Sequence, residues 1–167
     1  MDDKTYNVLF LCTGNSARSI MAEAILNVLG KGRFKAFSAG SNPNGQVQPM
    51  ARELAEAIGY DASQVRSKNW DEFAVEGAPE MDIVITVCDN AAGESCPLWL
   101  GHPALAHWGV PDPVAAIGDE DSLRRAYTAA FATLRRRIEL LLSLPLQSLD
   151  HLAAQAKLRE IGKVSAE

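Results

Sequence analysis

The chain has 167 residues, of which 47% are hydrophobic and 22% charged, and its formal net charge is −5. This balance is ordinary for a globular protein and argues against nucleic acid or an acidic membrane surface as a partner. The acidic residues 1–4 do not resemble a secretory signal, and no apolar run is long enough to span a membrane. We therefore expect a cytoplasmic protein, active as a monomer.

Apolar runs alternate with helical patterns along the chain. Strands are predicted at residues 6–11, 33–38, 81–88 and 104–108, and helices at 19–29, 48–58, 69–75 and 122–142. Helical connections between apolar strands imply a parallel sheet with right-handed crossovers. The expected fold is α/β: a single three-layer domain in which a four-stranded parallel sheet carries helices on both faces.

The C-terminal part of the chain predicts an addition to this domain. Residues 1–144 are expected to form the domain itself, and residues 145–167 a C-terminal helical extension packed on it. One short helix is predicted over residues 145–161 because leucines recur there at helical spacing. In the preceding long helix, the arginines at 135–137 are expected to face solvent.

The most informative segment joins the first strand to the first helix. Cys12 ends the apolar run, and Arg18 follows five residues later at the start of the helical pattern. Such a loop can direct backbone N–H groups into one concavity, to which the helix adds its positive N-terminal end. Arg18 can hold two oxygens of a tetrahedral anion, and the same positive field favours the thiolate of Cys12. A buried structural cysteine is the alternative, but the combination predicts nucleophilic chemistry on a phosphate-like anion.

The residues expected to bind the oxyanion run through the whole loop. They are Thr13, Gly14, Asn15, Ser16, Ala17, Arg18 and Ser19.

Two further cysteines, Cys88 and Cys96, flank a small polar segment. Cys88 is expected at the carboxyl end of the third strand, on the same edge of the sheet as Cys12. A disulfide needs Cα atoms within about 7 Å, so the segment must fold back before Cys88 and Cys96 can pair. A reversible relay of thiols fits this arrangement. A zinc site that recruits His107, or inert buried thiols, are the alternatives.

Asp112 lies between two prolines after the fourth strand. The prolines stiffen its loop, which lies at the same edge of the sheet because it follows the carboxyl end of a parallel strand. A carboxyl group held over the anion site could donate a proton to a departing oxygen. A turn-forming aspartate is the alternative at this position.

With these residues assembled, the chain resembles the arsenate reductases built on the low-molecular-weight protein tyrosine phosphatase fold. The resemblance covers roughly residues 5–142. It is carried by these segments: Cys12–Ser19, Ser38-Ala39-Gly40, Ser67-Lys68, Val87-Cys88, Cys96-Pro97, His107-Trp108-Gly109 and Asp112-Pro113. The anion loop and the Asp-Pro pair are shared with the phosphatases, whereas the cysteine pair and the His-Trp-Gly segment resemble the reductases alone.

The resemblance implies a course of reaction. Cys12 attacks arsenate while Arg18 and the loop amides hold the oxyanion and Asp112 protonates the leaving oxygen. Cys88 then attacks the sulfur of Cys12, arsenite leaves, and Cys96 moves the disulfide to the Cys88–Cys96 pair. Ser19 hydrogen-bonds the Cys12 thiolate. No cofactor is bound: an external thiol reductant is expected, thioredoxin first, with glutaredoxin and glutathione or mycothiol as alternatives, and phosphate or sulfate compete for the loop.

Two features depart from the pattern of these relatives. Ala17 stands where many carry another cysteine, so the loop has no local disulfide. Some relatives hold a potassium ion with residues matching Asn15, Glu23 and Ser38 and with an acid where this chain has Lys68. We expect no metal here: the Lys68 ammonium takes the ion's place, and Asn15, Ser19 and Lys68 support the loop.

Two other functions are kept as alternatives. A phosphatase for tyrosine-phosphorylated protein or a small phosphoester would need Cys12, Arg18 and Asp112 alone. The residues after Asp112-Pro113 include no aromatic side chain to enclose a phenyl ring, which weighs against it. A non-catalytic thiol redox sensor would be oxidised by peroxide without turning over an oxyanion.

Overall fold

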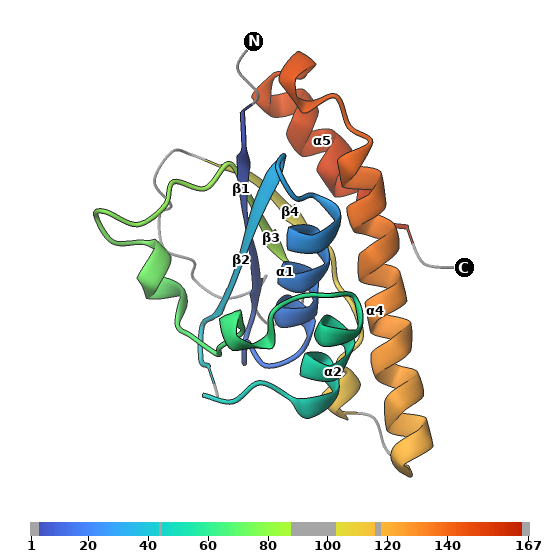
Figure 1. The fold of residues 1–167 in the computed structure, drawn as a ribbon. Helices are drawn as coiled ribbons and strands as arrows, with labels where there is room; N and C mark the ends of the chain where they lie inside the picture. The colour runs from blue at the N-terminus through green and yellow to red at the C-terminus, as the bar shows by residue number, and fades with distance from the viewer. Residues whose placement is uncertain (1–3, 44, 88–102, 116–117, 165–167) are drawn as a thin grey trace.

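The computed structural model describes residues 4–43, 45–87, 103–115 and 118–164 (Figure 1). Four parallel strands form one sheet in the order β2 (Phe34–Gly40), β1 (Tyr6–Cys12), β3 (Ile83–Thr86) and β4 (Ala104–His107). The register pairs Cys12 with Gly40 and Thr86 with His107, so the carboxyl ends of the strands form one edge. The predicted parallel sheet is confirmed.

Helices follow the strands in the expected order. The α-helices are α1 (Arg18–Leu29), α2 (Pro49–Ala57), α4 (Glu120–Leu142) and α5 (His151–Ile161). Short 3₁₀ helices are η1 (Ala62–Gln64), η2 (Trp70–Phe73), η3 (Pro113–Ala115) and η4 (Leu146–Ser148). In the described part of the chain, no helix combines the length and the hydrophobicity that crossing a bilayer requires.

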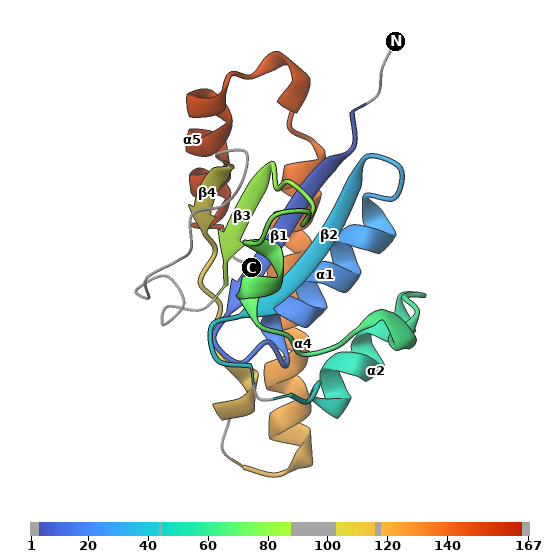
Figure 2. The same cartoon turned by 90° about the vertical axis from the view of Figure 1, so that its left-hand side faces the viewer.

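The alternation of β1 divides the core into two layers. Val8, Phe10 and Cys12 belong to the cluster that packs under α1 and α4, whereas Leu9 and Leu11 belong to the cluster on the opposite face. That second cluster is covered by Trp70 and Phe73 of η2. Figures 1 and 2 show α1 and α4 on one side of the sheet and the short η2 segment on the other. The three-layer arrangement is therefore as predicted.

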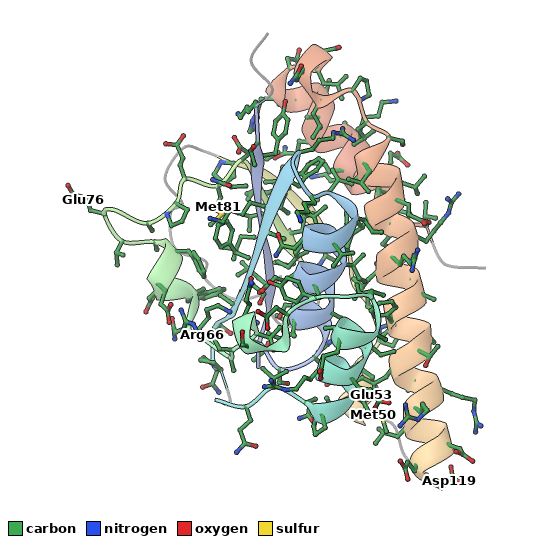
Figure 3. All side chains as sticks on the ribbon, in the orientation of Figure 1. Met50, Glu53, Arg66, Glu76, Met81 and Asp119 are labelled. Atoms are coloured by element: carbon green, nitrogen blue, oxygen red, sulfur yellow. The ribbon has the colours of Figure 1, made fainter. Side chains whose placement is uncertain are left out.

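Helix α4 also reaches beyond the sheet to α2. Glu53 of α2 lies toward α4 (Figure 3), and its Oε1 is 3.3 Å from an Arg124 guanidinium nitrogen. Both side chains are exposed, so this pair adds at most about 1 kcal/mol to stability. Buried residues of α1 and α4 pack in the same core cluster, including Met21, Leu134 and Ile138.

The predicted single helix over residues 145–161 is wrong in its extent. Leu149 has an extended backbone (φ −100°, ψ 138°), which separates η4 from α5. Asp150 then starts α5 anew, because its carboxylate accepts a hydrogen bond from the N–H of Ala153 at 2.8 Å. Leu158 and Ile161 of α5 join the main core.

The solvent-facing position predicted for Arg137 is also wrong. Its side chain is 6% exposed and donates to the carbonyls of Gly109 and Val164. Arg135 and Arg136 remain exposed. Charge alone did not reveal that one of three adjacent arginines points inward to meet two backbone carbonyls.

Candidate active site

The loop that begins at Cys12 lies at the carboxyl edge of the sheet. β1 ends at Cys12, which is 3% exposed, and α1 begins at Arg18. Ala17, at the N-cap of α1, has no side chain able to cap the helix. The first N–H groups of α1 are therefore suited to an anion, as the sequence predicts.

Neighbouring segments hold the carbonyls of the loop from outside. The carbonyl of Thr13 accepts from the N–H of Asn42 at 2.9 Å, and that of Ser16 accepts from Gln48 at 2.8 Å. The hydroxyl of Ser67 donates to the carbonyl of Gly14 at 3.1 Å. Because N–H and C=O of a trans peptide point in opposite directions, carbonyls bonded outside leave N–H groups for the interior of the loop.

Gly40 allows β2 to approach this loop closely. A Cβ at this position would lie 2.4 Å from the carbonyl oxygen of Thr13 and 2.7 Å from that of Cys12. Both contacts are with backbone, which cannot yield as a flexible side chain would. Only glycine fits here, because β2 supports the loop from beneath.

A chain of hydrogen bonds runs from the Cys12 sulfur into the interior. Cys12 Sγ lies 2.9 Å from the Oγ of Ser19, which also accepts from the Asn15 amide at 2.8 Å. Asn15 is fully buried and adopts a left-handed backbone with φ 45°, which asparagine tolerates. Its Oδ1 in turn accepts from the N–H of Lys68 at 2.8 Å. The structure thus brings together the three residues predicted to support the loop.

Behind this chain, Glu23 and Lys68 form a buried pair. Lys68 Nζ lies 3.9 Å from Glu23 Oε1 and donates to the carbonyl of Arg66 at 2.7 Å. The hydroxyls of Ser38 and Tyr60 donate to the two oxygens of Glu23 at 2.6 and 2.8 Å. An ammonium therefore sits beside this carboxylate and hydroxyl cluster.

Burial shifts the ionisation of this pair. It raises the pKa of Glu23, an effect that Lys68 and the two hydroxyl donors oppose. Burial likewise lowers the pKa of Lys68, and the charge of Glu23 is the main effect that opposes it. The charge of the Cys12 thiolate also raises the pKa of Lys68. Because coupling between charges is reciprocal, the Lys68 ammonium favours the ionised form of Cys12.

Arg18 links the loop to the segment that carries Asp112. One guanidinium nitrogen donates to the carbonyl of Val110 at 2.9 Å, and another lies 3.5 Å from Asp112 Oδ2. Arg18 is 15% exposed at its side chain and Asp112 41%, so the carboxyl group stands at the mouth of the site. The structure therefore places Cys12, Arg18 and Asp112 at one edge, where the carboxyl ends of the parallel strands were expected to bring them.

The other predicted thiols, Cys88 and Cys96, lie outside the described residues. His107, which the zinc alternative would need, sits at the end of β4 with its Nδ1 2.7 Å from the Thr86 hydroxyl. Within residues 4–43, 45–87, 103–115 and 118–164, no group of three or more histidine, cysteine or acidic side chains is arranged to hold a metal.

Sequence reasoning missed the groups that hold the predicted residues in place. The Val110 carbonyl that anchors Arg18 gives no side-chain signal, since any residue could supply it. Tyr60, which donates to Glu23, follows a turn glycine and resembles an ordinary surface tyrosine in the sequence. Burial raises its pKa, aided by the neighbouring Glu23, so it remains a protonated donor at neutral pH.

Comparison with known proteins identifies the class to which this fold and loop belong. Residues 7–155 match the family model for low molecular weight phosphotyrosine protein phosphatase, and the chain belongs to that family. An arsenate reductase of Bacillus subtilis (strain 168) is 37% identical over 114 residues, which are 68% of this chain and 78% of the relative. The resemblance to the arsenate reductases of this family is confirmed.

Solved structures agree with the sequence relatives. An arsenate reductase in the phosphate binding state has a TM-score of 0.64 at 27% identity, covering 83% of this chain and 97% of its own. A thioredoxin-dependent arsenate reductase of Corynebacterium glutamicum shares the fold with a TM-score of 0.58 at 24% identity. That match covers 89% of this chain and 66% of the Corynebacterium chain.

Proposed function

We propose that this protein reduces arsenate to arsenite and that Cys12 is the nucleophile. The observation that carries the proposal is the position of the Cys12 sulfur, 2.9 Å from the Ser19 hydroxyl, at the foot of a loop whose carbonyls are bonded outside. Arg18 closes the loop and is itself held by Val110 and Asp112. Relatives of this chain named arsenate reductase support the choice of substrate.

The first step forms a bond between sulfur and arsenic. The Cys12 thiolate attacks the arsenic of arsenate, and one oxygen departs as water after accepting a proton from Asp112. Arg18 and the inward N–H groups neutralise the charge of the remaining oxygens. Phosphate and sulfate, which have the same tetrahedral shape, compete for the loop.

The second step moves two electrons to arsenic. Cys88 as a thiolate attacks the sulfur of Cys12, the electron pair of the sulfur–arsenic bond stays on arsenic, and arsenite leaves. Cys96 then attacks Cys88, which frees Cys12 and leaves a Cys88–Cys96 disulfide. These two roles rest on the family resemblance and on the predicted place of Cys88 at the carboxyl end of the third strand.

An external thiol reductant must return two electrons to that disulfide in every turnover. The Corynebacterium glutamicum protein that shares this fold is named thioredoxin-dependent, which makes thioredoxin the first donor to test. Glutaredoxin with glutathione and mycothiol are the alternatives. We place the reaction in the cytoplasm, where such thiols are kept reduced.

The supporting residues set the ionisation of the nucleophile. Ser19 donates its hydroxyl hydrogen to the Cys12 thiolate, and the Asn15 amide orients Ser19. Lys68 adds a positive charge behind Asn15 and balances Glu23. The side chains of these three residues act through Cys12 rather than on arsenate.

Single-turnover reduction of arsenate in three cysteine variants tests the proposal. Cys12→Ser and Cys88→Ser are expected to release no arsenite. Cys96→Ser is expected to release one equivalent and to trap a Cys12–Cys88 disulfide, detected by peptide mass spectrometry. Repeated turnover by Cys88→Ser would eliminate the relay.

The same loop supports slow hydrolysis of phosphate monoesters as a side activity. Its geometry does not separate arsenate from phosphate, and the family model is that of phosphatases. The segment η3 beside Asp112 is Pro113–Ala115, which offers no aromatic wall for a phosphotyrosine ring. If the protein were instead a phosphatase, phosphate-monoester hydrolysis would persist in Cys88→Ser. In the unmodified protein, hydrolysis would then be faster than arsenate reduction.

A further inference from the structure

Helix α5 covers the outer edge of β4, as Figure 2 shows. The N–H of Leu105 donates to the side chain of Gln155 at 2.9 Å, and Arg159 donates to the carbonyl of Leu105 at 3.3 Å. An edge strand otherwise exposes its backbone groups to solvent or to another chain. Side chains of α5 thus take the place of a fifth strand along β4.

The contact becomes closer where β4 ends. The indole N–H of Trp108, a fully buried residue, donates to the carbonyl of Leu158 at 2.8 Å. At Gly162, just after α5, a Cβ would lie 2.4 Å from the carbonyl oxygen of His107 and 2.9 Å from the Trp108 ring. The end of α5 therefore rests directly on the backbone that leads into the Asp112 segment.

Arg137 of α4 joins the two segments through their backbones. It donates to the carbonyl of Gly109 at 3.1 Å and to that of Val164 at 2.8 Å. Arg137 is only 6% exposed as a residue; burying its charge is costly, and burial lowers its pKa. These two hydrogen bonds offset part of that cost and tie residue 109 to residue 164.

We propose that residues 150–164 brace the segment 108–112 and thereby position Arg18 and Asp112. Gly109, held by Arg137, directly precedes Val110, whose carbonyl holds Arg18, and Asp112 follows two residues later. The brace acts on the site of the proposed function, and its expected effect on turnover rests on that function. The family model ends at residue 155, inside α5, so the parts of the brace that touch Trp108 and Arg137 lie beyond it.

Two variants loosen the brace from different sides. Arg137→Met keeps most of the buried stem but removes both carbonyl contacts. Trp108→Phe keeps a buried ring, though a smaller one, and removes the hydrogen bond to Leu158, so it serves if Arg137→Met does not fold. Arg136→Met is the matched control, because Arg136 is the exposed neighbour on the same helix. None of these three variants changes Tyr127, whose pKa is raised by burial and by the nearby charge of Asp112.

Hydrogen exchange and arsenate turnover are measured on the same full-length samples. The two brace variants are expected to exchange amide hydrogens at least tenfold faster in peptides covering residues 107–112, with unchanged exchange in β1 and β2. Their kcat is expected to fall tenfold to a hundredfold, because small displacements of catalytic groups cost rate steeply. Arg136→Met is expected to match the unmodified protein in both measurements.

The exchange measurement separates failure of the brace from failure of the proposed function. Unchanged exchange over residues 107–112 in folded variants overturns the brace, whatever their activity. Faster exchange with a kcat within twofold of the unmodified protein overturns the positioning role. If the unmodified protein does not reduce arsenate, the proposed function fails. The readout that replaces kcat is then the protection that bound sulfate gives Cys12 against an alkylating agent. The positioning role predicts weaker protection by sulfate in both brace variants, and equal protection overturns it.

Discussion

Two segments meet at the carboxyl edge of the sheet and are held by different means. Residues 12–19 join the central strand β1 to α1, and their central contact, from Cys12 to Ser19, spans seven residues of chain. Residues 108–112 follow the edge strand β4 and are held by Arg18, Arg137 and Leu158, all at least 28 residues away. The hydrogen bond of Cys12 is therefore local, although Asn42 and Ser67 also bond to its loop. The segment that carries Asp112 is fixed mainly by distant parts of the chain, apart from the N–H of Val114, which donates to Asp112 at 3.0 Å.

The largest effect is expected from Arg18→Lys, because Arg18 belongs to both segments. Lysine keeps the positive charge but cannot donate at the same time to the anion, to the Val110 carbonyl and to the Asp112 carboxylate. We expect kcat/KM for arsenate to fall by about 10²–10³-fold, typical for the loss of one donor to a reacting oxyanion. Steady-state kinetics measures it. A fall of less than threefold would remove Arg18 from the site.

Gly40→Ala challenges the local segment alone. The added methyl would meet the carbonyls of Thr13 and Cys12, so the loop must shift. We expect a stability loss of about 1–3 kcal/mol in urea unfolding and a fall in kcat of about tenfold or more. Gly32→Ala is the control. Unlike Gly40, Gly32 has a positive φ of 90°, and it has open space around it, so its replacement should cost stability and leave kcat unchanged.

Lys68→Met tests the charge behind the loop. Without the ammonium, the Cys12 thiolate loses a favourable charge and Glu23 loses its partner. We expect the alkylation of Cys12 to shift to higher pH by up to about one unit, since removing a positive charge makes ionisation of the thiol harder. Lys68→Arg keeps the charge and should shift the profile less. A shift to lower pH would contradict the role of Lys68.

Asp150→Ala is expected to have the smallest effect and to act on the distant contacts. Asp150 caps α5 through the N–H of Ala153, and loss of such a cap costs about 1 kcal/mol. Thermal unfolding should shift to lower temperature, and exchange should increase in residues 151–155 first. Unchanged exchange there would show that α5 does not depend on its cap.

The difference between the two segments also explains what the sequence could predict. Cys12 and Arg18 are close in the chain, so strand, loop and helix periodicities were enough to place them together. The shared edge of Cys12 and Asp112 followed from the parallel direction of the strands that precede them. The roles assigned to these residues, to Cys88 and to Cys96 remain predictions, as does the division at residue 144.

The groups that the sequence did not reveal act through backbone atoms. Arg137 donates to the backbone carbonyls of Gly109 and Val164, and the side chains of these two residues give no sequence signal of that contact. The break before α5 depends on the extended backbone of Leu149, which the leucine spacing of the segment conceals. Long-range contacts to backbone leave almost no trace in composition or periodicity, so only the structure shows them.

The ionisation of Cys12 is the claim on which the rest depends. The rate of its alkylation by iodoacetamide, followed by peptide mass spectrometry across pH with and without arsenate, measures it directly. We expect a thiolate that forms well below the pH of about 8.5 typical of a free cysteine, and protection by arsenate. An ordinary cysteine profile with no protection by arsenate would contradict the account.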